Sequence, residues 1–274
     1  MTGDVVVIEP RRGILRVSPR ELWHYRDLFT LLVWRDIKVR YQQTALGALW
    51  AVMQPVLLMV VFAVFLGRLA DVPSEGIPYP LFAYCGLVPW TFFSQGFAGT
   101  ASSLIENERL VTKVYFPRLL VPIAAAASYG VDFAIAHVLM VGLLLHYDIE
   151  PRATMLLVPL LAVGVFGVIV SYGLGLAALN VRYRDVRYVI PFGVQLLLFL
   201  TPVVYPARLV TGGWRYAYAA NPMAALVDLY RWAILGTEHM PGSALAVSAV
   251  SAALFLAVGI AYFQRVERSF ADVI

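Results

Sequence analysis

Charged residues are scarce in this sequence of 274 residues. Only 14% of them are Asp, Glu, Lys or Arg, whereas 61% are hydrophobic and the mean hydropathy is +0.76. A soluble domain usually carries about a quarter charged residues. The chain therefore cannot cover itself with polar surface in water, and its long apolar blocks favour a bilayer as their solvent. The net charge of +4 does not indicate a nucleic-acid partner, because in such a chain the placement of the charges matters more than their sum.

The sequence also lacks the residue patterns of disulfides, metal sites and ATP hydrolysis. The single cysteine, Cys85, lies in an apolar block and by itself forms neither an internal disulfide nor a metal site. No G-x-x-x-x-G-K-[ST] phosphate loop is present, so the chain cannot hydrolyse ATP by that route. The four histidines are scattered, without an H-E-x-x-H motif or a Ser/His/Asp set. These absences argue against an enzyme and predict no cofactor in this chain.

The apolar blocks predict an all-α integral membrane protein with six transmembrane helices. A span needs roughly 20 apolar residues, and most of the blocks are long enough to cross with some tilt. The fifth block is short and contains Pro191, Pro202 and Pro206. Broken helices are tolerated where protein or a water-filled cavity receives the freed carbonyl groups, so this block is expected to line a cavity. The expected spans are 44–66, 79–104, 119–145, 155–179, 189–206 and 243–263.

The first 43 residues are expected to form a cytoplasmic segment with an interfacial helix. Ser18, Pro19 and Glu21 form a capping box with proline at the first helical position. The helix that follows is amphipathic, and its apolar run from Leu28 to Trp34 is too short to span. Aromatic residues together with basic residues on such a helix are typical of one that lies in the membrane interface.

The basic residues predict the orientation of the chain. With the N-terminus in the cytoplasm and six spans, 16 of the 21 Lys and Arg residues lie on the cytoplasmic side and five on the outer side. Positively charged residues favour the cytoplasmic side of bacterial membrane proteins. Both termini are therefore expected to be cytoplasmic.

The outer segment before the last span, residues 207–242, is long and rich in aromatic residues. Asn221-Pro222 is a helix-start signal and Gly236 is a helix-stop signal. We expect two short re-entrant helices that dip into the outer leaflet. The alternative is an ordinary loop that rests on the membrane, which such an apolar composition disfavours.

Two further features have more than one explanation. Asp132 is the one ionisable residue near the middle of a predicted span, and it either joins a polar network that holds the bundle together or takes part in the transport pathway. The loop from Ile105 to Arg118 mixes apolar and acidic residues with basic ones. Positive-inside anchoring explains its basic residues, whereas a short amphipathic helix that ends at Pro117 and docks a cytoplasmic partner explains the whole pattern.

Nearly the whole chain after about residue 20 resembles the permease subunits of ABC-2 type exporters of cell-surface polysaccharides, such as O-antigen, capsule and teichoic acid. Together the matching stretches are highly specific, although no single one is. They are RDIKVRYQQTALGALWAVMQP (35–55), GIPYPLFAYCGLVPWTFF (76–93), LVTKVYFPRLLVPIA (110–124), LNVRYRDVRYVIPF (179–192), LTPVVYP (200–206), NPMAALVDLYRWAILG (221–236) and RSFADVI (268–274).

The resemblance implies a transmembrane domain of the ABC-2 type over residues 44–274, re-entrant outer gate helices, and location in the bacterial inner membrane. It implies a homodimer with two separate ATP-binding cassette subunits that carry ATP and Mg²⁺, and a lipid-linked polysaccharide as the substrate. The implied roles are head-group binding by Arg35, Lys38 and Arg40; coupling to the ATPase by Glu106, Glu108, Arg109, Lys113 and Tyr115; and outer gating by Tyr205, Trp214, Asn221, Pro222, Tyr230 and Trp232.

Aromatic residues inside the second and third blocks are candidates for the wall of the channel. Trp90, Phe92, Phe93 and Tyr129 could stack on sugar rings, although core packing is the commoner use of such residues. Rival functions are a secondary transporter or channel that needs no ATPase, and a membrane-integral glycosyl or acyl transferase. Within the ABC-2 class, export of teichoic acid, a drug or a small lipid is the nearest alternative.

Overall fold

The computed structural model describes residues 19–42, 47, 49–183, 185–237, 242–267 and 270, and every regular element within these ranges is helical. The expected helix start at Ser18 and the expected start of the first span at Thr44 lie outside the described residues. In chain order the elements are α1 (Pro19–His24), α2 (Arg26–Gln42), α3 (Leu49–Phe62), the π-helical η1 (Ala63–Leu69), α4 (Tyr79–Glu106), α5 (Glu108–Lys113), α6 (Leu120–Ser128), α7 (Gly130–His146), the 3₁₀ turn η2 (Ala153–Leu157), α8 (Val158–Arg182), α9 (Val186–Leu200), the 3₁₀ turn η3 (Ala207–Leu209), α10 (Trp214–Ala219), α11 (Pro222–Leu235) and α12 (Gly242–Val266).

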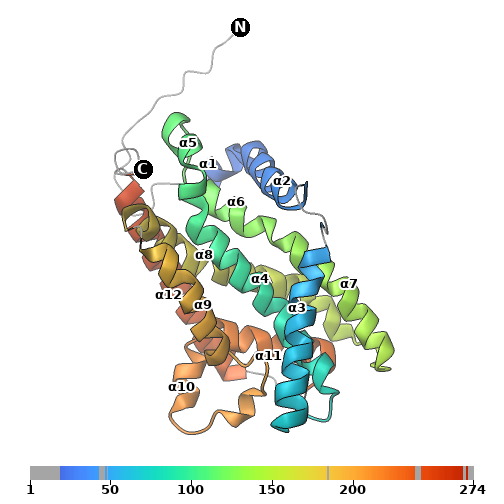
Figure 1. Cartoon of the computed structure of the whole chain (residues 1–274). Helices are drawn as coiled ribbons and strands as arrows, with labels where there is room; N and C mark the ends of the chain where they lie inside the picture. Colours follow the sequence, from blue (N-terminus) through green and yellow to red (C-terminus); the bar gives the residue numbers. More distant parts are fainter. Residues whose placement is uncertain are drawn as a thin grey trace.

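Helix α4 forms the centre of the bundle (Figure 1). It packs against α3, α6, α7, α8, α9 and α11, and every side chain from Leu81 to Phe93 is buried. Two close approaches join it to α8, because a Cβ atom on Gly96 would lie 2.8 Å from Ile169 and one on Gly173 would lie 2.5 Å from Thr100. Since protein rather than lipid surrounds α4, its sequence can include proline, glycine and hydroxyl residues among the aromatic ones.

Four of the six expected spans are helices that are long and apolar enough to cross a bilayer. Within the described residues these segments are Leu49–Leu69, Leu120–His146, Ala153–Arg182 and Ala244–Val266. The 28 residues of α4 extend over about 42 Å, but this buried helix is less apolar than the other four. Helix α9 is apolar, but its 15 residues extend over only about 22 Å. The full count of six spans therefore stays a prediction.

The expected interfacial helix consists of α1 and α2, which lie across one end of the bundle (Figure 1). Leu32 is buried in a cluster with Val111, Phe116 and Phe263. Trp23 and Trp34 are 70% and 64% exposed on the other side of the helix. Its apolar residues thus occur on both faces, of which one packs on the bundle and the other is exposed. We call this end, which also holds α5 and the C-terminal end of α12, the α2 end.

The two short helices expected in the outer segment are α10 and α11, which lie at the opposite end of the bundle (Figure 1). The side chain of Asn221 caps α11 by accepting a hydrogen bond from the backbone N–H of Met223 at 3.1 Å, and Pro222 occupies the first turn. Gly236 ends the helix in the left-handed conformation, with φ of 69°. With 14 residues, α11 extends over about 21 Å, which is too short to span a bilayer.

Candidate functional site

A polar cluster joins the end of α2 to the start of α7. Nη1 of Arg40 donates to Oδ2 of Asp132 at 2.6 Å, and Nη2 donates to Oγ of Ser128 at 2.8 Å. The guanidinium carbon lies 3.6 Å from the centre of the Tyr129 ring. The Tyr41 hydroxyl donates to Oδ1 of Asp132. Of the two roles considered for Asp132, the geometry supports a polar network.

The chain positions this cluster through a break between two helices. α6 ends at Ser128 and α7 begins at Gly130, so Tyr129 lies at the junction and Asp132 lies in the first turn of α7. The Asp132 side chain is 8% exposed and that of Arg40 is 26% exposed. A carboxylate held this deeply requires a cation, which Arg40 supplies from α2.

A pocket of about 390 Å³, which we call the arginine pocket, opens beside this cluster. It unites two of the three predicted head-group residues, Arg35 and Arg40, with the predicted channel residue Tyr129 and the predicted coupling residue Glu106. Lys38, the third predicted head-group residue, is exposed and does not line the pocket. The other lining residues are Asp36, Val39, Gly99, Asn107, Ala125 and Ser128.

Both arginines of the arginine pocket are paired with carboxylates. Nη2 of Arg35 lies 2.7 Å from Oδ1 of Asp36, and Arg40 is paired with Asp132. Desolvation by the walls of the pocket and the neighbouring Asp36 carboxylate raise the pKa of Glu106 above its ordinary value. Each guanidinium has five N–H groups, so both arginines can bind an anion while they keep these contacts.

A second pocket of about 310 Å³, the tryptophan pocket, is lined by both members of the Arg40–Asp132 pair. Nε2 of Gln95 on α4 donates to Oε1 of Gln54 on α3 at 2.7 Å. Sequence reasoning did not single out Trp50, Gln54 or Gln95. A signal was present, because Gln54 is an isolated amide within an apolar span and lies four residues after Trp50, on the same helical face. The other lining residues are Arg40, Tyr41, Gly47, Ala51 and Asp132.

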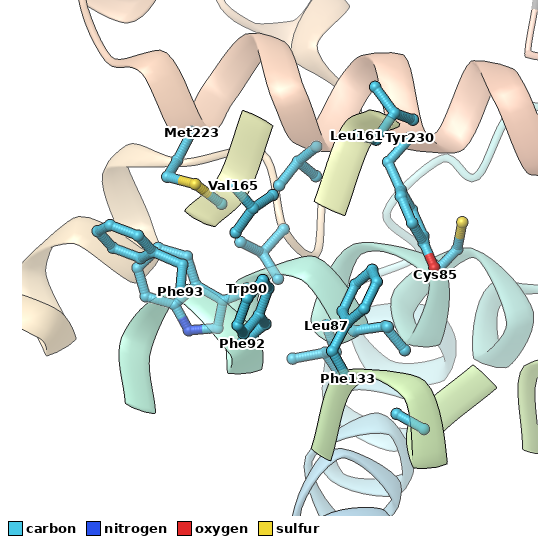
Figure 2. Close-up of a cluster of buried hydrophobic side chains, with 14 of the residues drawn as sticks. Cys85, Leu87, Trp90, Phe92, Phe93, Phe133, Leu161, Val165, Met223 and Tyr230 are labelled. Atoms are coloured by element: carbon cyan, nitrogen blue, oxygen red, sulfur yellow. The ribbon is translucent and has the colours of Figure 1, made fainter. Parts of the chain in front are cut away.

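The other three predicted channel aromatics line neither pocket. Trp90, Phe92 and Phe93 are 4%, 5% and 1% exposed. Figure 2 shows them in the hydrophobic core between α4, α7, α8 and α11, and the Phe92 ring lies 5.1 Å from that of Phe133. Within this single chain they pack the core, and stacking on sugars would require a change in that packing.

The predicted coupling segment forms a short, separate helix. α4 ends at Glu106, and α5 extends from Glu108 to Lys113, two residues short of Tyr115. Val111 anchors α5 because it is buried, 1% exposed, in the cluster that contains Leu32. The charged residues Glu108, Arg109 and Lys113 are exposed, and Tyr115 is 80% exposed. The α2 end thus carries a small projecting helix with a charged surface (Figure 1).

Of the predicted outer gate residues, Tyr205 belongs to the non-helical turn that follows α9, and Asn221 contacts that turn. The Tyr205 hydroxyl donates to the carbonyl of Phe199 at 2.8 Å, and Nδ2 of Asn221 donates to Oγ1 of Thr201 at 2.9 Å. The Tyr230 hydroxyl is hydrogen-bonded to Nε2 of His137 at 2.5 Å, which ties α11 to α7. Trp214 on α10 is 76% exposed. Pro222 is buried and Trp232 is partly buried.

Sequence reasoning placed Arg231 among the basic residues of the outer side, but the structure buries it to 2% exposure. Its guanidinium donates to the carbonyls of Pro202 and Val203, and at 3.4 Å to that of Tyr205. The guanidinium carbon also lies 3.9 Å from the centre of the Phe82 ring. Arg231 therefore links α11 to the turn after α9. The signal that was present is an arginine that follows Asp228 by three residues in a mostly apolar helical pattern, and the two side chains lie 3.9 Å apart.

The chain is similar to bacterial polysaccharide exporters. The sequence model of the ABC-2 type transporter family matches residues 27–235. The O-antigen export system permease protein RfbA of Myxococcus xanthus is 32% identical over 260 residues, covering 93% of this chain and 98% of that protein. A protein of the same name from Klebsiella pneumoniae is 25% identical, covering 90% and 95% of the two chains. The polysialic acid transport protein KpsM of Escherichia coli is 23% identical, covering 86% and 92%.

Proposed function

The chain belongs to the ABC-2 type transporter family, and from this premise we propose that it exports a lipid-linked polysaccharide of the O-antigen type across the inner membrane. Members of this family are transmembrane subunits that lack the ATPase domain, so ATP is bound by a separate subunit. Similarity to exporters of O-antigen and of polysialic acid over about nine-tenths of the chain supports the substrate class. Two copies of the chain would assemble with two ATP-binding subunits, which carry Mg²⁺ with the nucleotide.

The observation that carries this proposal is the arginine pocket beside the interfacial helix. Arg35 and Arg40 line one pocket next to α2, and Lys38 is exposed on the same helix. Guanidinium groups bind phosphate oxygens in a bidentate manner, and basic residues at the membrane surface attract anionic head groups. The diphosphate of a lipid-linked glycan would bind here while its lipid remains in the bilayer.

Deletion of the gene tests the proposed function. Lipid-linked polysaccharide should accumulate on the cytoplasmic side, and the polysaccharide should disappear from the cell surface, as measured by surface labelling and by analysis of extracted lipids. Complementation with Arg35→Gln should export about tenfold less than wild type, because a charge-assisted hydrogen bond to phosphate is lost. Arg26→Gln changes an exposed arginine on the same helix outside the pocket and should complement fully. Normal surface glycan in the deletion strain would contradict the proposed function.

Helix α5 is proposed to dock the ATP-binding subunit. Its charged side chains are exposed while Val111 fixes it to the bundle, so α5 could pass the closure of the ATP-binding subunits on to α4. Reversing both charges, Glu108→Lys with Arg109→Glu, should abolish export, while the permease still inserts and the ATP-binding subunits still hydrolyse ATP. Asp148→Asn lies after the C-terminal end of α7 and should leave export unchanged. Wild-type export by the double variant would contradict the docking role.

Both termini are proposed to be cytoplasmic. The excess of basic residues supports this orientation, as does the cluster that packs Leu32 of α2 against Phe263 and Val266 of α12 at one end of the bundle. Reporter proteins fused at residues 1 and 274 should both be active in their cytoplasmic form. Reporters on opposite sides of the membrane would require an odd number of spans.

With both termini in the cytoplasm, the segment from Tyr205 to Gly236 would form the outer exit gate.

A further inference from the structure

Two amide side chains lie on a surface where a membrane span usually presents apolar groups. Gln54 is exposed on α3, about 8 Å from the start of that helix, and it is hydrogen-bonded to the partly exposed Gln95 of α4. The span Leu49–Leu69 is otherwise strongly apolar at this depth. Polar side chains in the membrane face a water-filled path, a polar partner or the interior of a bundle, because exposure to hydrocarbon is costly. The amide pair therefore marks a polar surface.

The tryptophan pocket surrounds this amide pair with groups that suit a carbohydrate. Trp50 is 50% exposed and lies one helical turn before Gln54, so its ring and the amide share one face of α3. Asp132 and Tyr41 form the wall toward the α2 end. An aromatic ring packs on the apolar face of a sugar, while amide and carboxylate groups bind its hydroxyls. An acyl chain would leave these polar groups without such partners.

The position of the tryptophan pocket relates it to the proposed head-group site. Arg40 lines both the arginine pocket and the tryptophan pocket, so the two share one wall. In a lipid-linked glycan the first sugar is bonded directly to the diphosphate. A diphosphate on Arg35 and Arg40 would thus place that sugar beside the Arg40–Asp132 pair.

We propose that Trp50, Gln54 and Gln95 form a binding subsite for the sugar that is attached to the lipid diphosphate. This inference rests on the proposed function, because it requires a lipid-linked glycan in the arginine pocket. The subsite gives the permease a means to distinguish a glycosylated lipid diphosphate from the bare lipid carrier. Gln54 and Gln95 provide the hydrogen bonds, and Trp50 provides the stacking surface.

The test measures binding of two probes to the full chain, purified with its ATP-binding subunit in lipid nanodiscs. One probe is a polyprenyl diphosphate without sugar, and the other is the same lipid carrying a single hexose. Trp50→Ala and Gln54→Leu should each weaken binding of the hexose probe about five- to tenfold, the range of one lost hydrogen bond or stacking contact. Binding of the sugar-free probe should not change. Trp50→Phe keeps an aromatic ring and should retain most of the affinity for the hexose probe.

Leu57→Ala is the matched control, because Leu57 is exposed on the same helix and does not line the pocket. It should bind both probes as wild type does. The subsite is overturned if Trp50→Ala and Gln54→Leu weaken both probes equally, or if wild type binds the two probes with the same affinity. It is also overturned if these variants instead disrupt pairing of two copies, as measured by the mass of the complex. If wild type binds neither probe, the proposed function itself fails.

Discussion

Replacing Arg231 by leucine is expected to lower the stability of the protein by about 3–5 kcal/mol, because the change leaves buried polar groups without partners. The segment after α9 is not helical, so its carbonyl groups depend on side chains for hydrogen bonds. Arg231 serves Pro202, Val203 and Tyr205, whereas Tyr79 donates to the carbonyl of Val204 at 2.7 Å. Without Arg231, the turn would have to separate from α11 or lose these hydrogen bonds. Thermal unfolding of the purified protein in detergent measures the effect.

Arg231→Lys is a second informative variant. Lysine keeps the charge, but its compact ammonium group cannot donate to several carbonyl groups as a planar guanidinium does. Arg231→Lys should therefore lose most of the stabilisation that Arg231→Leu loses. Arg208→Gln is the matched control, because Arg208 is an exposed arginine at the same end of the bundle, and its 3.7 Å pair with Glu75 should contribute less than about 1 kcal/mol. Unfolding of Arg231→Leu at the wild-type temperature would show that the turn does not depend on this side chain.

The same contacts make Arg231 a candidate for moving the proposed outer gate. They fasten the end of α9 to α11, so a displacement of α9 would pull α11 with it. Gly86 of α4 provides the space for this arrangement, because a Cβ atom there would collide with the Val203 carbonyl and with Nη2 of Arg231. Export should therefore fall together with stability in Arg231→Leu. Measurement of surface glycan in a strain complemented with this variant checks that expectation.

Local sequence signals predicted much of the helical architecture. The signals for the two ends of α11 act through the local backbone. A capping side chain and a proline start the helix, and a left-handed glycine ends it. The structure confirms that Asn221, Pro222 and Gly236 delimit α11. Long apolar runs likewise predicted the four segments that meet the requirements of a span, because hydrocarbon imposes the same requirement on each of them. Signals of this kind depend on neighbours in the chain and not on the fold.

The partners of buried residues could not be predicted in this way. Arg40 and Asp132 are 92 residues apart, so their pairing depends on how α2 packs on the bundle. The aromatic residues Trp90, Phe92 and Phe93 have a composition that suits a channel, a lipid belt or a core equally well, and only packing decides among them. Pro202 and Pro206 indicated a break after α9, but no local pattern identified Arg231 as the side chain that serves the carbonyl groups there. Packing also decides the burial of α4. Its sequence is less apolar than that of the other spans, although most of its residues are buried, because protein and not lipid surrounds it.

Replacing Asp132 by leucine is the second change with a large expected effect. It should weaken the packing of α2 on the bundle by about 3 kcal/mol of free energy. Asp132 accepts hydrogen bonds from both Arg40 and Tyr41, and burial together with the bond to Asp132 raises the pKa of Tyr41 above its ordinary value. Without the carboxylate, Arg40 keeps its hydrogen bond to Ser128 and its contact with the Tyr129 ring, but its charge is no longer compensated. Amide hydrogen exchange in α2 should accelerate, whereas exchange in α8 and α12 should not.

The double variant Arg40→Met with Asp132→Leu tests whether an uncompensated charge or lost packing causes the effect of Asp132→Leu. If the penalty arises from an uncompensated charge, removing both partners should restore most of the protection of α2, although export should remain low because the arginine pocket has lost Arg40. Exchange in α2 as fast in the double variant as in Asp132→Leu would assign the effect to lost packing. Exchange in α2 and export are expected to respond differently to the double variant. Packing of α2 requires only that no charge is left uncompensated, whereas the proposed binding of a diphosphate requires the positive charge of Arg40. Under the proposed function, Asp132 would compensate the charge of Arg40 until an anionic head group binds.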